Sequence, residues 1–267
     1  MTRLASPGTA LVTGASSGIG ALYAQRLAHR GHDLILVARN GSRLSALAGR
    51  IHAATGRTVR TITADLSDAS DLARVEETLR TDASITMLVN NAGVGATAPL
   101  LQADVDKMSE LIALNTNALM RLTYAAVPGF VARGLGTVIN IASIVAVAPE
   151  LLNGVYGASK AFVLAFTQSL QHELADKGVR VQAVLPGATA TEFWDVAGMP
   201  VTHLPQQIVM SAEHLVDAAI AGLDAGEVFT VPSLPEVAQW DAFEAARRAM
   251  GPNLSLTTPA ARYGLAA

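Results

Sequence analysis

The sequence predicts an α/β protein with a doubly wound parallel β-sheet between two layers of helices. Three observations carry this prediction. Apolar runs of strand length alternate with helix-length segments along the 267 residues, as in parallel sheets with right-handed crossovers. The run 34–38 is continuously apolar, which indicates a strand covered on both faces. Glycines within 14–20 directly follow the first apolar run, where such folds bind phosphates. We therefore expect a Rossmann-like fold with three α/β/α layers.

The expected elements follow one another without a linker, a repeat or a low-complexity segment. Strands are expected at 9–13, 34–38, 58–63, 87–89, 137–142, 179–185 and 228–231. Helices are expected at 21–30, 41–55, 68–80, 103–133, 155–177 and 211–225. Pro128 is expected to kink or interrupt the helix 103–133, because proline has no backbone N–H to donate. One domain over residues 1–267 is the economical interpretation, with 188–210, which lacks periodicity, as a substrate lid and 232–267 as a C-terminal extension.

Composition narrows the possible functions. Hydrophobic residues make up 51% and charged residues 15%, which indicates a large core and buried subunit surface. The net charge is −3 without a Lys/Arg cluster, so neither nucleic acid nor a membrane is an expected partner. There are no cysteines, and the histidines lack zinc-site spacing, so no metal site is expected. No secretory segment or membrane span is evident, and a cytoplasmic location is expected.

Tyr156 and Lys160 form the first chemical motif. They are four residues apart, so on a helix their side chains share one face. A positive charge about 6 Å from a phenol, at an effective dielectric near 20, favours phenolate by roughly 2 to 3 kcal/mol. We therefore expect Lys160 to lower the pKa of Tyr156 by about two units, close to the range of a neutral-pH proton donor and acceptor. A tyrosine four residues before a lysine is also common in proteins without this role.

The glycine loop and the arginine after the second strand are the next motif. Gly14, Gly18 and Gly20 lie between a strand and a helix, where backbone N–H groups and the positive helix end attract an anion such as a pyrophosphate. Their spacing differs from the common G-x-G-x-x-G pattern. Arg39 stands at the end of the second strand, where arginine accommodates the 2′-phosphate of NADP and an acid would favour NAD. We expect NADP(H), with Arg43 adding a second contact.

Several motifs occur together in one order. They are Thr13-Gly14-x-x-x-Gly18-x-Gly20, Asn90-Asn91-Ala92-Gly93, Asn115, Ser143, Tyr156-x-x-x-Lys160 and Pro186-Gly187. The combination, over about residues 8–190, resembles the short-chain dehydrogenase/reductase family. The resemblance implies an NADP(H)-dependent oxidoreductase in which Tyr156 exchanges a proton with the substrate oxygen. It also implies that Lys160 lowers the tyrosine pKa and holds the nicotinamide ribose, Ser143 bonds the carbonyl oxygen, and Asn115 holds a water of the proton relay.

The same resemblance assigns contacts to the cofactor. The cofactor-binding positions are Gly14, Ser16, Ser17, Gly18, Ile19 and Gly20 at the pyrophosphate, Asp65 and Leu66 at the adenine, Asn91, Ala92 and Gly93 in a cofactor-facing loop, Tyr156 and Lys160, and Pro186, Gly187, Thr189 and Thr191 at the nicotinamide. Two other functions remain open. One is an NADP-sensing regulatory protein without turnover, and the other is an epimerase or dehydratase on the same fold.

The expected lid predicts the substrate. Residues 188–210 contain aromatic and aliphatic side chains but no Lys or Arg, and an anionic substrate usually needs such a partner. We expect a neutral, mostly apolar ketone, aldehyde or secondary alcohol, covered by Trp194 or Phe193. The expected substrate pocket is Val94, Ile144, Val145, Leu152, Phe193, Trp194 and Met199.

The helices 103–133 and 155–177 are long and apolar. Leu119, Leu122, Phe166 and Leu170 are expected to need a partner beyond the sheet. Members of the family that the sequence resembles commonly pair through these two helices, so a homodimer or homotetramer is expected.

Overall fold

Seven parallel strands form the central sheet in the computed structural model, which describes residues 7–265. Their order is β3-β2-β1-β4-β5-β6-β9. The chain runs outward from β1 to β3 and then returns to the other side of β1 at β4, so the direction of winding switches between β1 and β4. Ligands bind at such a switch, beyond the carboxyl ends of the strands. The strands are β1 (Thr9–Thr13), β2 (Asp33–Ala38), β3 (Val59–Thr63), β4 (Ile85–Asn90), β5 (Gly136–Ile141), β6 (Val179–Val184) and β9 (Phe229–Thr230).

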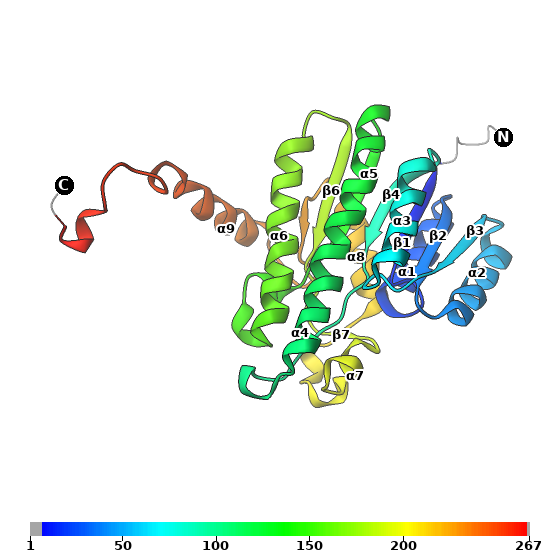
Figure 1. The fold of residues 1–267 in the computed structure, drawn as a ribbon, viewed down its shortest axis with the longest axis horizontal. Helices are drawn as coiled ribbons and strands as arrows, with labels where there is room; N and C mark the ends of the chain where they lie inside the picture. The colour runs from blue at the N-terminus through cyan, green and yellow to red at the C-terminus, as the bar shows by residue number, and fades with distance from the viewer. Residues whose placement is uncertain (1–6, 266–267) are drawn as a thin grey trace. The chain divides into compact units, whose positions relative to one another are not determined.

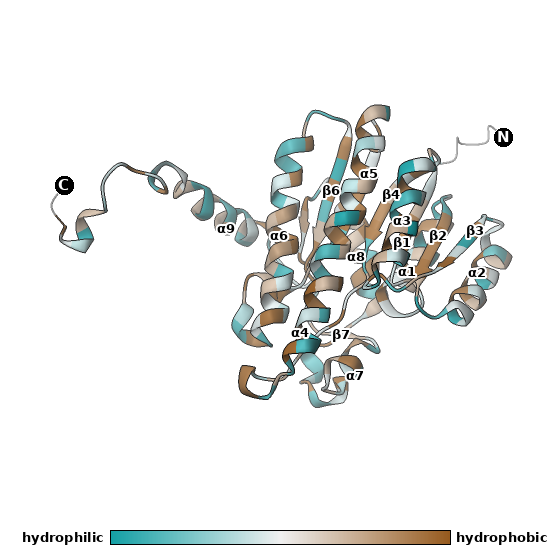
Figure 2. Ribbon diagram, viewed as in Figure 1, coloured by the Kyte–Doolittle hydropathy of each residue, from teal (hydrophilic) through white to brown (hydrophobic). Residues whose placement is uncertain are grey.

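Helices cover both faces of the sheet, which confirms the predicted three layers (Figure 1). One buried cluster joins the sheet to α1, α2 and α8, and a second joins it to α3, α5 and α6. The strands β2 and β4 are mainly brown in Figure 2, whereas the helices show both brown and teal residues. The helices are α1 (Gly18–His29), α2 (Gly41–Thr55), α3 (Ala69–Thr81), α4 (Val105–Ile112), α5 (Leu119–Arg133), α6 (Gly154–Leu174) and α8 (Ala212–Asp224).

The predicted long helix 103–133 is divided at a different place from the one expected. α5 continues through Pro128, and the departure from α-helical geometry is a π-helical turn, η2 (Ala113–Ala118). The interruption expected at Pro128 is therefore wrong. Proline leaves unbonded only the carbonyl four residues earlier, at Tyr124, and Tyr124 lies on the exposed side of the helix. The π-turn contains Asn115, and such turns are frequent at functional sites.

The segment expected as a lid has local structure that its sequence did not suggest. β7 (Thr189–Ala190) pairs in parallel with β8 (Met210–Ser211), so the two ends of the segment are joined at its base. Between them lies the short helix α7 (Phe193–Ala197), followed by the 3-10 turns η5 (Val201–His203) and η6 (Gln206–Ile208). The expectation of an irregular stretch is therefore corrected, because short-range turns and a two-residue strand pair leave no sequence period.

The chain divides into two compact units, one ending at Pro232 and the other beginning at Ser233. Within the second unit the helix α9 (Val237–Ala249) is followed by the 3-10 turns η7 (Gly251–Asn253) and η8 (Ala261–Tyr263). Glu244 on α9 forms ion pairs with Arg247 and Arg248. In neither unit is any described helix both long and apolar enough to cross a membrane.

Candidate active site

The predicted catalytic residues converge at the carboxyl ends of β4 and β5. Ser143 follows β5 by two residues, and Tyr156 and Lys160 lie in the first turns of α6. Asn153 caps this helix, because its side-chain oxygen accepts hydrogen bonds from Val155 N at 2.8 Å and Tyr156 N at 3.3 Å. The cap fixes where α6 begins, and therefore where its first turn presents the tyrosine.

Tyr156, Ser143 and Lys160 are all buried and adjacent. The Ser143 hydroxyl is a hydrogen-bond partner of the Tyr156 phenol. The Lys160 ammonium lies 5.8 Å from the centre of the Tyr156 ring, close to the distance expected from helical spacing. Its Nζ donates to the Ile141 carbonyl at 2.9 Å, at the end of β5. The three side chains thus form one compact group of proton donors and acceptors.

The expected pKa of the phenol is wrong in direction. Burial raises the pKa of Tyr156 to about 12, although the hydrogen bond with Ser143 lowers it. Burial also lowers the pKa of Lys160 to about 8. The sequence argument counted only the attraction between ammonium and phenolate, whereas in the structure desolvation penalises the charged form of both groups. Tyr156 therefore keeps its proton at neutral pH.

Asn115, in the π-turn, joins the catalytic helix to the loop after β4. Its side-chain oxygen accepts a hydrogen bond from Val94 N at 2.9 Å, and its Nδ2 donates to Val94 O at 2.9 Å. The same Nδ2 donates to the Ser159 hydroxyl at 3.1 Å, which donates to Tyr156 O at 2.8 Å. Asn115 therefore contacts α6 through Ser159, a buried residue that the sequence reasoning missed. Its position directly before Lys160 was the available signal.

The glycine loop has the form of an anion cradle. Gly14 has a φ of +64°, and a Cβ there would lie 2.7 Å from Asn91 Nδ2. A Cβ on Gly20 would lie 2.4 Å from Gly14 O, so neither position accepts a side chain without a shift. Ser17 begins α1 without a side-chain cap bond to any described residue, and the first turn has no acid. The backbone N–H groups of this turn therefore form a positive helix end without a side-chain cap.

The loop after β4 is bonded onto the glycine loop. Asn91 Nδ2 donates to Thr13 O at 2.8 Å and to Gly14 O at 3.2 Å. The Thr13 hydroxyl accepts from Asn91 N and Ala92 N, each at 3.0 Å. A Cβ on Gly93 would lie 3.0 Å from Asn115 Oδ1 and 3.6 Å from Lys160 Nζ. The predicted residues 91–93 thus lie between the glycine loop and the catalytic group.

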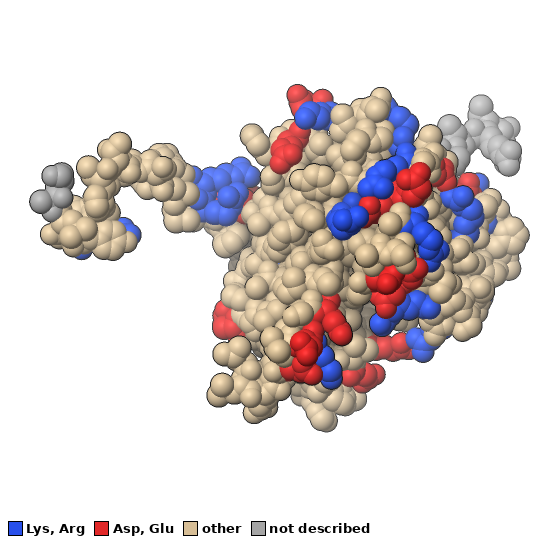
Figure 3. Space-filling view, viewed as in Figure 1, with Lys and Arg blue, Asp and Glu red and all other residues tan. Residues whose placement is uncertain are grey.

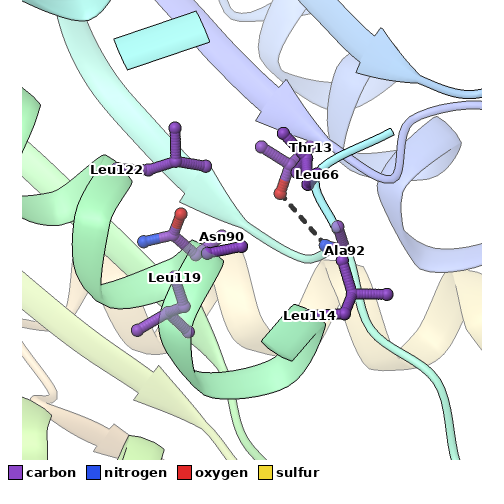
Figure 4. A pocket seen from close by; sticks show the side chains of 8 residues that line it. Thr13, Leu66, Asn90, Ala92, Leu114, Leu119 and Leu122 are labelled. Atoms are coloured by element: carbon purple, nitrogen blue, oxygen red, sulfur yellow. Dashed lines mark hydrogen bonds between the residues drawn. The ribbon is translucent and has the colours of Figure 1, made fainter. Parts of the chain in front are cut away.

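Figure 4 shows a small hollow beside this loop. It contains Leu66, the predicted adenine-side residue, together with Leu114 of the π-turn, which the sequence reasoning did not select. The lining residues are Thr13, Leu66, Asn90, Ala92, Leu114, Ala118, Leu119 and Leu122. The hollow has no room for a water molecule, and it places Leu66 beside Thr13, the residue that precedes the glycine loop.

The two predicted arginines lie after β2 and each faces a carboxylate. The Arg39 side chain is 72% exposed, and its guanidinium lies 4.0 Å from Asp65. Arg43 is placed by the Asn40 cap, whose oxygen accepts from Arg43 N at 3.0 Å, and its guanidinium pairs with Glu192 of the lid at 2.7 Å. Arg39 is thus the more accessible of the two cations.

The segment 188–210, predicted as a lid, reaches both the glycine loop and the tyrosine. A Cβ on Gly18 would lie 3.3 Å from Thr191 Cγ2, and one on Gly95 would lie 2.2 Å from Phe193 Cζ. The Phe193 ring lies 5.8 Å from the Tyr156 ring. Trp194 is buried behind it, edge-on at 5.6 Å, and its indole N–H donates to Thr189 O at 2.9 Å. Phe193 rather than Trp194 therefore faces Tyr156.

The remaining pocket predictions divide into two groups. Val94, Val145, Leu152 and Phe193 pack in one cluster with Tyr156, together with the unpredicted Ala96, Met108, Leu111 and Val155. Ile144 and Met199 are outside this cluster of described residues. Ile144 lies instead beside the nicotinamide-side residues, because its N–H donates to Pro186 O at 3.0 Å. Next to the tyrosine, the site is therefore apolar on several sides.

Charged side chains are unevenly spread over the visible surface. Figure 3 shows blue and red side chains gathered over α3, whereas the surface over α6 carries few. Within residues 7–265, no group of three or more His, Asp or Glu side chains is placed to hold a metal ion.

These features are those of a nucleotide-dependent α/β enzyme, and comparison with known proteins gives the family. The family model described as short chain dehydrogenase matches residues 8–198. The chain belongs to the short-chain dehydrogenase family, as its motifs predicted.

Three relatives show how far the likeness extends. A short-chain dehydrogenase from Sphingobium yanoikuyae, solved in complex with NADPH, is 49% identical with a TM-score of 0.93, over 96% of this chain and 100% of that one. A bulky-bulky ketone specific alcohol dehydrogenase from Comamonas testosteroni is 43% identical with a TM-score of 0.89, over 97% and 99%. A serine 3-dehydrogenase from Rhizobium radiobacter is 36% identical over 187 residues, or 70% and 74% of the two chains. The likeness to the two solved structures extends beyond the family match at residue 198.

Proposed function

We propose that this oxidoreductase reduces neutral, mostly apolar ketones or aldehydes with NADPH, or oxidises the corresponding secondary alcohols with NADP. One observation carries the proposal. A buried phenol bonded to a serine hydroxyl lies at the carboxyl ends of the strands, against an apolar cluster that includes Phe193. Such an arrangement places a proton donor where a carbonyl carrying apolar substituents would bind.

The residues present fit NADP(H). The Gly14–Gly20 cradle, closed to side chains, suits a pyrophosphate, and the exposed Arg39 suits a 2′-phosphate. Arg43 supports the same choice, although its pairing with Glu192 makes it a weaker contact than expected. The relative from Sphingobium yanoikuyae is itself in complex with NADPH, which favours this cofactor over NADH.

The bound cofactor supplies the hydride that the carbonyl carbon accepts. Tyr156, protonated at neutral pH, gives its proton to the carbonyl oxygen, so an alcohol forms and the phenolate is left to be reprotonated. The Ser143 hydroxyl donates a hydrogen bond to the same oxygen while negative charge develops on it. Lys160, held by the Ile141 carbonyl, stabilises the transient phenolate and would hold the nicotinamide ribose of the bound cofactor. Asn115 keeps the 94–95 loop and Ser159 in place around this group.

The lid supports the substrate class. Phe193 lies on Tyr156, so a substrate must displace or slide beside its ring, and Trp194 braces the ring from behind. Residues 188–210 contain no Lys or Arg to pair with a carboxylate or phosphate. The ketone specificity of the relative from Comamonas testosteroni is in line with this proposal.

Assembly and location belong to the same proposal. Leu122 and Leu170 are buried in the sheet-facing core and Leu119 is buried as well, so the expectation that they need a partner is wrong. On α5 and α6 the exposed aromatic residues are Tyr124, which is 69% exposed, and Phe162, both stacked on Phe166. This stack supports a homodimer or homotetramer, and light scattering at micromolar concentration tests the assembly. The proposed location is the cytoplasm.

Absorbance of NADPH with paired substrates tests the function. We expect net oxidation of NADPH with a neutral branched ketone and little with a keto acid of matched size. A sensor protein would bind NADPH without turnover. An epimerase or dehydratase would convert its substrate without net loss of NADPH. A clear preference for the keto acid would contradict the proposed substrate class.

A further inference from the structure

Four buried polar side chains form a chain of hydrogen bonds beneath the catalytic group. Asn90 Nδ2 donates to the Thr123 hydroxyl at 3.0 Å and to Asn140 Oδ1 at 2.9 Å. Asn140 Nδ2 then donates to the Thr167 hydroxyl at 3.0 Å. The chain therefore runs from α5 across β4 and β5 to α6. All four residues are buried.

The bonds can form in one direction only. The Thr123 hydroxyl donates to Leu119 O at 2.8 Å, and the Thr167 hydroxyl donates to Val163 O at 2.8 Å. Each hydroxyl proton is thus used within its own helix, and each hydroxyl oxygen is left to accept an amide proton from a strand. Both asparagine side chains are oriented by this requirement, so the network has a single arrangement.

The two end residues of this hydrogen-bond network, Thr123 and Thr167, lie at similar distances along the sequence from the proposed catalytic residues. Thr123 follows Asn115 by about two turns, and Thr167 follows Lys160 by about two turns. On the strand side, Asn140 directly precedes Ile141, whose carbonyl accepts the Lys160 bond. One continuous network therefore ties the two helices that carry Asn115, Tyr156 and Lys160 to the strands β4 and β5.

Apolar packing alone leaves the position of a helix along its axis loosely determined. Contacts such as those of Val163 and Leu170 with the core are non-directional. A hydrogen bond weakens steeply once its angle or length departs from the optimum, so it resists such sliding. The bond from Lys160 to Ile141 resists it too, but Lys160 is itself a proposed catalytic residue. The Asn140–Thr167 hydrogen bond holds α6 along its axis independently of Lys160.

We propose that Asn140 and Thr167, linked through Asn90 to Thr123, are positioning residues that set the place of Tyr156 and Lys160 relative to Ser143. The inference rests on the proposed function of that catalytic group. A misplacement of about 1 Å can reduce the rate of an enzyme by about a hundredfold. We expect the partial loss of this network to lower kcat by about tenfold, with little change in the affinity for NADPH.

The test is Thr167→Val in the full chain, compared with Thr167→Ser. Valine keeps the shape and removes the hydroxyl, whereas serine keeps the hydroxyl and restores the bond. The matched control is Thr230→Val, because the Gln182 side chain donates to the Thr230 hydroxyl at 2.9 Å in a buried bond between β6 and β9. Activity is measured well below the melting temperature of every variant, so that loss of stability does not lower kcat.

We expect kcat to fall about tenfold in Thr167→Val and to stay within twofold of the parent in Thr167→Ser and Thr230→Val. Equal kcat in Thr167→Val and the parent, or an equal loss in Thr230→Val, would overturn the inference. If Thr167→Val does not fold, Thr123→Val tests the other end of the chain, with Thr123→Ser as its control and the same two outcomes.

Hydrogen exchange gives a readout without turnover. In the cofactor-free protein, amide exchange of residues 155–160 should rise in Thr167→Val and stay at the parental rate in Thr230→Val. Unchanged exchange in Thr167→Val would overturn the inference, even in an active enzyme. If the parent shows no NADPH-dependent turnover, the proposed function fails, and the exchange result alone decides whether the network positions this helix turn.

Discussion

The catalytic group and the lid meet at the Tyr156 ring but are held in different ways. Asn115 lies in the π-turn before α5, Tyr156 and Lys160 lie on the long helix α6, and buried hydrogen bonds such as Lys160 to Ile141 fix them. The lid is joined at its base by the β7–β8 pair and reaches the cofactor side through the exposed ion pair of Arg43 with Glu192. An exposed pair of this kind contributes about 0 to 1 kcal/mol.

Because the two regions are held differently, we expect the first to determine the reaction rate and the second to determine which substrate is preferred. Breaking a buried hydrogen bond leaves a polar group unpaired at a cost of about 1 to 3 kcal/mol, so the catalytic group has one arrangement. Residues 188–210 are held by the exposed Arg43–Glu192 pair, by two hydrogen bonds from Thr97 to Ala197 O and by the packing of Phe193, and we propose that this segment opens so that Phe193 moves from Tyr156. We expect substitutions in the first region to change the rate of any substrate, and those in the second to change which substrate is preferred.

The largest effect is expected from Tyr156→Phe. Phenylalanine keeps the ring on which Phe193 packs and removes the proton donor, so turnover should fall by about 10² to 10⁴. The affinity for NADPH, measured by fluorescence titration, should be nearly unchanged. A variant that retains more than a few per cent of the parental rate would contradict the role of the phenol.

Lys160→Met tests the burial of the proposed catalytic group through the pH dependence of protein stability. The folded-state pKa of Lys160 is lowered to about 8 from 10.5. Between these values the unfolded chain binds a proton that the folded protein does not, so the free energy of unfolding rises with pH across this window. The parent should gain roughly 2 to 3 kcal/mol relative to Lys160→Met between pH 8 and pH 10. Urea unfolding at both pH values measures it, and a constant difference would show that the lysine is not desolvated.

Arg39→Ala tests the exposed cofactor side. A hydrogen bond to a charged group contributes about 1.5 to 3 kcal/mol, so NADPH should bind about ten to a hundred times more weakly. NADH should be little affected, because it lacks the 2′-phosphate. Titration of both cofactors against parent and variant gives the two ratios. Equal losses for the two cofactors, or a parent that prefers NADH, would remove Arg39 from this role.

The smallest effect is expected on the lid side, from the length of the substrate. Each extra methylene buried against the Phe193 cluster should stabilise the transition state by up to about 0.8 kcal/mol, which raises kcat/KM roughly fourfold. A series of neutral ketones assayed with NADPH measures it. Phe193→Ala should flatten the series, whereas Trp194→Ala should act through lid stability, since Trp194 faces Phe193 and Thr189. A flat series in the parent would place the substrate chain elsewhere.

Much of this protein is determined by local sequence. Continuous apolar runs and helix-length segments gave the order of strands and helices, and the helix expected at 41–55 has the observed bounds of α2. The glycine loop and the Tyr156–Lys160 spacing identified the site, because each is a contiguous motif whose geometry follows from its own backbone. The position of the π-turn could not be predicted, since it depends on the contacts of Asn115 with Val94 and Ser159.

Tertiary structure alone decided properties that depend on surroundings rather than on spacing. Spacing placed Lys160 near the phenol, but burial set the direction of both pKa shifts, because desolvation depends on residues from distant elements. The same holds for Leu122, which an apolar helix could have turned inward or outward and which packs in the core. The bonds that join Asn90 to Thr123 and Asn140 to Thr167 link residues far apart along the chain, so only the folded arrangement reveals that they share one network.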